Sequence, residues 1–131
     1  MTAKESKSLL SIIELGGYPD FTNLYQQAGF DVVKAVSTRK ALVLIKQIRP
    51  DVIVSEFIYA PTYGARISNL ESLFAGIQMV RPDTKLIVLL YKEDLHHLES
   101  LKSRFPLFDI LFFPIQESML RKTIERAASE F

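Results

Sequence analysis

Short apolar runs alternate along this chain with stretches whose apolar residues recur at helical spacing, and turn residues separate the two kinds of segment. The clearest case follows Pro50, which ends one amphipathic stretch and is followed almost at once by the run Val52-Ile53-Val54. A β-branched run without alternation is typical of a strand buried on both faces of a parallel sheet. The pattern therefore predicts an α/β domain in which helices cover a parallel sheet.

Five strands and five helices are predicted, in alternation. The strands are Leu9–Leu15, Phe30–Val36, residues 52–56, Leu86–Leu90 and Phe108–Phe113. The helices are Asp20–Ala28, three stretches that end before Pro50, Pro82 and Pro106, and Glu117–Ala128, with Phe131 facing inward. Five such units joined by right-handed crossovers favour the flavodoxin-like strand order 2-1-3-4-5 in a three-layer sandwich.

Several residue types at the predicted boundaries are suited to helix ends. Ser37 or Thr38 can cap the second helix, and Asp94 can cap the fourth. Ser68 and Glu71 have the spacing of a capping box at the start of the third helix, and Gly29 suits the end of the first. Residues 58–67, which include Pro61 and Gly64, are predicted to form a loop.

The length of 131 residues suits one domain, predicted over residues 8–131 after a polar N-terminal tail of residues 1–7. The absence of Cys excludes disulfides and thiolate metal sites. A net charge of +1 gives no general attraction to nucleic acid or to anionic membranes. The first apolar run is too short to span a membrane and no signal-peptide cleavage site follows it, so a cytoplasmic location is expected.

Two acidic residues stand near the ends of predicted strands, Glu14 in the first and Glu56 in the third. Because functional groups in open α/β sheets gather at the carboxyl ends of strands, both are site candidates. Mg²⁺ prefers oxygen ligands, but two carboxylates without further protein charge bind it weakly. The preferred interpretation is two solvated carboxylates and no cofactor, with a weak Mg²⁺ site as the alternative.

Several features of the chain match a known family: the order and length of these elements, the Arg49-Pro50-Asp51 sequence before the third strand, the acid at Glu56, and the prolines Pro61 and Pro114. In these features the chain resembles the receiver domain of bacterial response regulators, the CheY-like family. The resemblance covers residues 8–130. It implies a phosphoryl-acceptor position at Glu56 and an acidic pair at Glu14 and Leu15. It also implies a hydroxyl position at Leu90, a lysine position at Phe113 and a switching aromatic at Ile110.

Each of these positions departs from the family pattern that the resemblance implies. Glu56 is one methylene longer than the usual Asp, and Leu15 has replaced the second acid. Leu90, Phe113 and Ile110 are hydrocarbon where a hydroxyl, a lysine and a switching aromatic are expected. Because developing phosphoryl charge would then lack stabilising groups, the sequence predicts a degenerate pseudo-receiver without catalysis.

The expected function is protein–protein interaction in bacterial signalling or regulation, with Glu56 as a fixed negative charge. The resemblance implies pairing with a protein partner or with itself through the fourth helix, the fifth strand and the fifth helix. Basic residues that could decorate that face are Lys102, Arg104, Arg121, Lys122 and Arg126. The alternatives are a phosphorylatable receiver with unusual chemistry and the receiver domain of a longer transcriptional regulator.

Two further groups of residues have functional interpretations. His96 and His97 are adjacent on a predicted helix and are expected to point to different faces as ordinary surface residues. Phe113 lies where a polar pocket is expected, and an apolar patch there suggests a contact surface.

Overall fold

The computed structural model describes residues 6–62 and 65–131. Its elements are β1 (Lys7–Ile12), α1 (Thr22–Gln27), β2 (Phe30–Ala35), α2 (Thr38–Ile48), β3 (Val52–Glu56), β4 (Tyr59–Thr62), β5 (Ala65–Ser68), α3 (Asn69–Val80), β6 (Lys85–Leu90), the 3-10 turn η1 (Lys92–Asp94), α4 (Leu95–Lys102), β7 (Asp109–Phe112) and α5 (Glu117–Ser129). Residues 1–5 of the expected tail, and Gly64 of the expected loop, lie outside the described residues.

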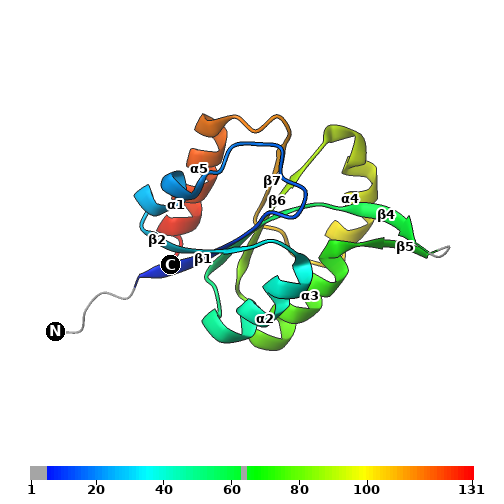
Figure 1. The fold of residues 1–131 in the computed structure, drawn as a ribbon, viewed down its shortest axis with the longest axis horizontal. Helices are drawn as coiled ribbons and strands as arrows, with labels where there is room; N and C mark the ends of the chain where they lie inside the picture. The colour runs from blue at the N-terminus through cyan, green and yellow to red at the C-terminus, as the bar shows by residue number, and fades with distance from the viewer. Residues whose placement is uncertain (1–5, 63–64) are drawn as a thin grey trace.

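The main sheet has the predicted order, β2-β1-β3-β6-β7, and every neighbouring pair of strands in it is parallel. β6 and β7 are the fourth and fifth strands of the sequence prediction. Figure 1 shows α1 and α5 together on one face of this sheet and α2 and α3 on the other. The chain therefore has the flavodoxin-like, three-layer fold that the alternation of segments predicts.

Burial of the central strand explains why the sheet forms as it does. All five residues of β3 are buried, and Ile53 is fully inaccessible to solvent. Side chains alternate along the strand, so Ile53 packs into the core beneath α2, α3 and α4, while Val52 and Val54 pack into the core beneath α1 and α5. A strand that supplies two cores must be apolar on both faces, as the β-branched run is.

Three of the four predicted helix caps are confirmed by the structure. The Ser37 side chain accepts a hydrogen bond from the Lys40 N–H at the start of α2. Ser68 and Glu71 form the predicted capping box of α3. Gly29 follows α1 with φ of +99°, a left-handed conformation that glycine adopts at little cost. The exception is Asp94, which stands at the N-terminus of α4 without a side-chain capping bond.

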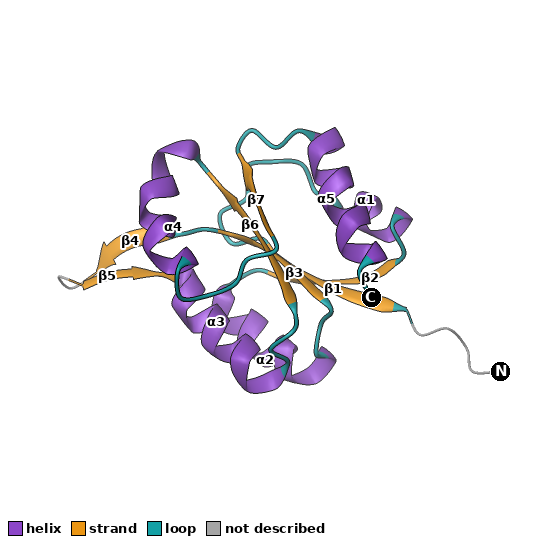
Figure 2. Cartoon of the chain, turned by 180° about the vertical axis from the view of Figure 1, so that it is seen from behind, coloured by secondary structure: helices purple, strands orange, loops and turns teal. Residues whose placement is uncertain are grey.

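The expected loop over residues 58–67 is instead an antiparallel hairpin formed by β4 and β5. Asn69 secures its base, because the Ile58 N–H donates to Asn69 Oδ1 at 2.8 Å and the Asn69 N–H donates to the Ile58 carbonyl at 3.1 Å. Both views place the hairpin beside α4, away from α1 and α5 (Figures 1 and 2). The prediction was wrong because contacts at the base, rather than apolar alternation, define these strands.

Three other expectations require correction. β1 runs from Lys7 to Ile12, so it includes the last residue of the expected tail and ends before Glu14. α1 begins at Thr22 rather than at Asp20. Phe131 is 49% exposed rather than inward-facing, and its ring lies 4.1 Å from the Lys85 ammonium.

Asp20 makes part of the stability of the folded chain depend on pH, through contacts in the loop before α1. Its carboxylate accepts hydrogen bonds from Lys34 Nζ at 2.7 Å and from the Thr22 N–H at 2.9 Å, which lower its pKa to about 2. The pKa of Asp20 is therefore lower in the folded chain than in the unfolded chain. The stabilisation that these contacts give to the folded state is present above pH ~4 and is lost as the pH falls toward 2. Because the ion pair is half-exposed, we expect Asp20→Asn to cost only about 0.5–1 kcal/mol at neutral pH.

Urea unfolding of Asp20→Asn and the unmodified chain at pH 7 and pH 2.5 checks this prediction. The difference between the two proteins should shrink at the lower pH. A difference of the same size at both pH values would contradict it.

Candidate functional site

Glu56 is a buried acid at the carboxyl end of the central strand. It is the last residue of β3 and is only 2% exposed, although it stands at the sheet edge where functional groups gather. Burying a carboxylate is costly unless hydrogen bonds replace its water. Its partners therefore determine what this edge of the sheet can do.

Backbone amides of the loop after β1 supply those partners. Glu56 Oε1 accepts from the N–H groups of Glu14 at 2.7 Å and Leu15 at 3.0 Å. Oε2 accepts from the N–H groups of Leu15 at 3.2 Å and Gly16 at 2.8 Å. We call these three N–H groups, from residues 14–16, the amide clasp. Successive N–H groups that converge on one anion form the kind of concave site that proteins use to bind phosphate.

Two glycines shape the loop that carries the amide clasp. Gly16 and Gly17 have φ values of +69° and +85°. Residues with a Cβ rarely adopt such angles, so the pair allows the chain to turn back sharply after Leu15. The diglycine therefore belongs to an anion-binding turn that follows β1, rather than to the end of the strand itself.

Tyr18 lies next to the same carboxylate. The pKa of its phenol is raised well above the ordinary value, first by burial and second by the negative charge of Glu56. The phenol therefore stays protonated at physiological pH. Its ring also packs against Phe113, with the two ring centroids 5.0 Å apart.

The two acids singled out from the sequence do not direct their carboxylates at a common point. The Glu14 carboxylate accepts from the N–H of Thr38 at 2.9 Å, at the N-terminus of α2, while its own N–H joins the amide clasp. Leu15, at the position of the second acid, is 70% exposed. Within residues 6–62 and 65–131 no group of three or more acids or histidines could hold a metal ion. The expectation of a solvated carboxylate is wrong for Glu56, because backbone N–H groups rather than water bind its oxygens.

Hydrocarbon fills the three remaining positions that the family resemblance marks. Leu90 is 1% exposed and packs in the core beneath α2–α4, and Ile110 packs against that same core. Phe113 is partly buried between two tyrosines, 5.0 Å from Tyr18 and 4.9 Å from Tyr91 between ring centroids. No side chain at these positions can donate a hydrogen bond to an anion.

A cavity of about 270 Å³ opens above Glu56. Its lining residues are Leu15, Gly16, Glu56, Phe57, Ile58, Tyr59, Tyr91, Asp94 and Phe113. The sequence predicts Leu15, Glu56 and Phe113 as site positions, but it predicts Asp94 only as a helix cap. Backbone amides leave no direct trace in the sequence, and the Gly16-Gly17 pair was the one available signal of the clasp.

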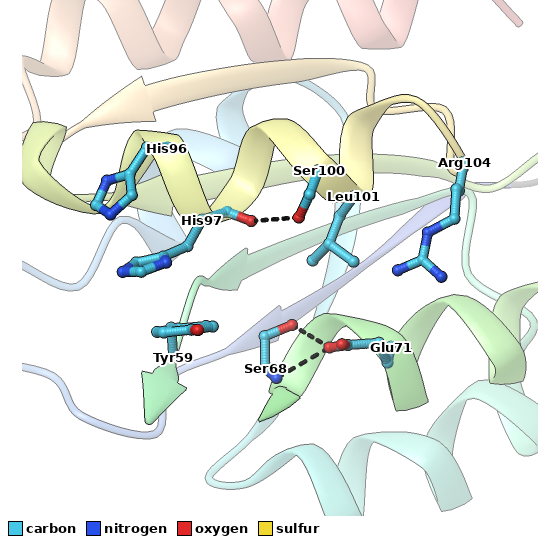
Figure 3. Close-up of a pocket in the computed structure, with 8 residues that line it drawn as sticks. All are labelled: Tyr59, Ser68, Glu71, His96, His97, Ser100, Leu101 and Arg104. Atoms are coloured by element: carbon cyan, nitrogen blue, oxygen red, sulfur yellow. Dashed lines mark hydrogen bonds between the residues drawn. The ribbon is translucent and has the colours of Figure 1, made fainter. Parts of the chain in front are cut away.

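A second cavity, of about 260 Å³, lies between the hairpin and α4 (Figure 3). The Tyr59 ring, at its edge, stacks on His97 with centroids 3.7 Å apart. The rings of His96 and His97 are 3.8 Å apart, so they do not point to different faces as expected. Their Cα positions differ by about 100° around the helix, but the flexible side chains bring the rings into contact.

Two arginines of the expected interaction face form ion pairs with acidic neighbours. That face consists of α4, β7 and α5 in the structure. Arg126 Nη2 lies 3.1 Å from Asp109 Oδ2, and Arg121 Nη2 lies 3.5 Å from Glu117 Oε2. Arg104 lies just beyond α4 and lines the second cavity.

No protein-family model matches the chain, and no curated protein matches it. Among solved structures, it is similar to a response regulator receiver domain protein from Clostridium thermocellum, with a TM-score of 0.70, 20% identity and 94% of each chain covered. It is also similar to the chemotaxis protein CheY4 of Vibrio cholerae, with a TM-score of 0.67, 20% identity, and 94% of this chain and 99% of that chain covered.

A third similar structure is NtrX from Brucella abortus in complex with ATP, with a TM-score of 0.73 and 15% identity. The match covers 95% of this chain but only 27% of that protein. At these identities the likeness establishes that the chain has the receiver-domain fold. Within residues 6–62 and 65–131, no helix is long and apolar enough to cross a bilayer.

Proposed function

We propose that this receiver-fold chain is a pseudo-receiver: it does not accept a phosphoryl group and acts by binding other proteins in bacterial signalling or regulation. The amide clasp carries the proposal. Both oxygens of the Glu56 carboxylate are engaged by backbone N–H groups, and the side chain is 2% exposed. An acceptor must instead present a free oxygen in line with the leaving group.

The chemistry around Glu56 supports the same conclusion. Phosphoryl transfer depends on positioning and on cationic or hydrogen-bonding groups that stabilise spreading charge. Leu90 and Phe113 offer no such group, and the Glu14 carboxylate is bound to Thr38. Losing one such donor commonly costs about 10²–10³ in rate, so losing several leaves no useful reaction. We expect neither Mg²⁺ nor another cofactor to be required.

A permanently bound carboxylate suits an interaction module that has one state. The hydrogen bonds of Glu56 join the end of β3 to the loop after β1 permanently. A phosphoryl group at this edge would make such contacts only while it was attached. The proposed contact face is α4–β7–α5, used with a protein partner or a second copy of the chain. The net charge of +1 offers no attraction to nucleic acid or to a membrane surface.

One observation favours the alternative that the chain is a segment of a longer regulator. The NtrX structure contains a segment of this fold, and the match covers only 27% of that protein. The chain would then be the receiver segment of a longer regulator, and the amide clasp would fix its contribution to that regulator.

Incubation with acetyl phosphate and Mg²⁺, followed by intact mass measurement, tests the proposal. We expect an unchanged mass under conditions that modify a receiver domain carrying the full acceptor set, run in parallel. An added phosphoryl group on Glu56 would overturn the proposal in favour of an atypical phosphorylatable receiver.

A further inference from the structure

The cavity above Glu56 has aromatic walls contributed by three strand ends. Tyr91 and Phe113, which follow β6 and β7, lie with ring centroids 4.9 Å apart and planes inclined by 42°. Phe57 and Tyr59, which follow β3, lie 6.2 Å apart in a stacked arrangement. Stacking on His97 supports the Tyr59 ring from the other cavity (Figure 3). The walls therefore present aromatic surface that neighbouring rings hold in place.

The charged residues that line this cavity are all acidic. Two acidic residues, Glu56 and Asp94, belong to its lining, and no Lys, Arg or His is among the described lining residues. Glu56 is neutralised in part by the amide clasp. Asp94 differs, because its carboxylate makes no hydrogen bond or ion pair with any other described residue. It is partly buried beside Tyr91, whose side chain is 57% exposed.

We propose that this cavity binds an arginine side chain of a protein partner. The inference rests on the proposed interaction function and names the chemistry by which the partner is recognised. A cation near the face of a tyrosine is attracted by the ring, and a guanidinium can stack on the ring while donating to a carboxylate. An ammonium is more strongly hydrated and cannot stack, so arginine fits this pairing better than lysine.

The size of the cavity is compatible with the entry of a single side chain. Its volume of about 270 Å³ lies below the roughly 300–1,000 Å³ that is usual for pockets that enclose small molecules. Aromatic residues at a contact surface, with arginine as their partner, are also the residue types that dominate binding energy between proteins. The cavity is adjacent to the amide clasp, so the bound conformation of Glu56 would determine the shape of its floor.

A titration of the ¹⁵N-labelled chain with a capped glycine–arginine–glycine peptide, followed by ¹H–¹⁵N NMR, tests the proposal. The matched probe contains citrulline, which has nearly the same shape without the charge. We expect saturable shifts at the amides of Tyr91 and Asp94, and affinity for the arginine peptide about tenfold higher than for the citrulline peptide. A lysine peptide should fall between them.

Two variants test whether Asp94 is responsible for the preference for arginine. Asp94→Asn should reduce the affinity for the arginine peptide to that for citrulline, while Glu93→Gln, an exposed acid on the same turn that does not line the cavity, should leave it unchanged. Equal binding of both peptides, or an Asp94→Asn variant that retains wild-type selectivity, would overturn the proposal. Thermal unfolding of each variant establishes that it is folded.

The outcome is independent of the phosphodonor experiment. A chain that gains a phosphoryl group and still selects arginine would contradict only the proposed function. A chain that stays unmodified and does not select arginine would contradict only this inference.

Discussion

Replacing Glu56 with Gln is expected to lower the free energy of unfolding by about 2–4 kcal/mol, because four charge-assisted hydrogen bonds depend on its two oxygens. The amide group offers only one acceptor oxygen. Its NH₂ group would face an N–H donor of the clasp, so at least one part-buried amide of residues 14–16 would lose its partner. Urea unfolding at pH 7 measures the loss.

The matched control is Glu14→Gln. Glu14 is also a glutamate with a backbone N–H partner, but its carboxylate is exposed at the N-terminus of α2. We expect that change to cost about 1 kcal/mol or less. Equal losses in the two variants would mean that the amide clasp contributes no more than an ordinary exposed helix cap.

Replacing Glu56 with Asp, the acid that the family resemblance implies, is expected to destabilise the chain by about 2–3 kcal/mol without restoring phosphoryl transfer. Removing one methylene withdraws the carboxylate by about 1.5 Å. The clasp contacts of 2.7–3.2 Å would then exceed hydrogen-bonding distance unless the loop moves. The shorter acid would be buried with fewer partners.

Acetyl phosphate and Mg²⁺ with intact mass measurement, together with urea unfolding, test this variant. Leu90 and Phe113 remain hydrocarbon in it, so the mass should stay unchanged. Glu14→Asp, the matched control at the exposed acid, should be nearly as stable as the unmodified chain. Phosphorylation of Glu56→Asp would show that the length of the acid, rather than the missing helper groups, prevents the reaction.

The strand order could be predicted because apolar runs alternate with helical stretches along the chain, and because the central strand has the apolar composition that a two-sided core requires. β3 shows this directly, with Ile53 in one core and Val54 in the other. The prolines and cap residues at element ends act locally, so Ser37 and Ser68 could be assigned from the sequence. The hairpin could not be, because contacts of Asn69 with Ile58 define its base.

The candidate site was only partly predictable for a similar reason. Glu56 could be placed at the edge of the sheet, but whether its carboxylate met water, a cation or backbone depended on the path of the loop after β1. Glu14 illustrates the limit, since its backbone rather than its carboxylate meets Glu56. Asp94 belongs to the cavity because η1 places it there, and its sequence neighbours do not indicate this.

Native-state hydrogen exchange of the backbone amides tests the amide clasp most directly. The N–H groups of Leu15 and Gly16 should be protected in the unmodified chain and should exchange at least about tenfold faster in Glu56→Gln. The Thr38 N–H, which donates to Glu14 instead, should exchange at the same rate in both proteins. Equal exchange of Leu15 and Gly16 in the two proteins would contradict the account, because Glu56 would then be free of the backbone that is proposed to hold it.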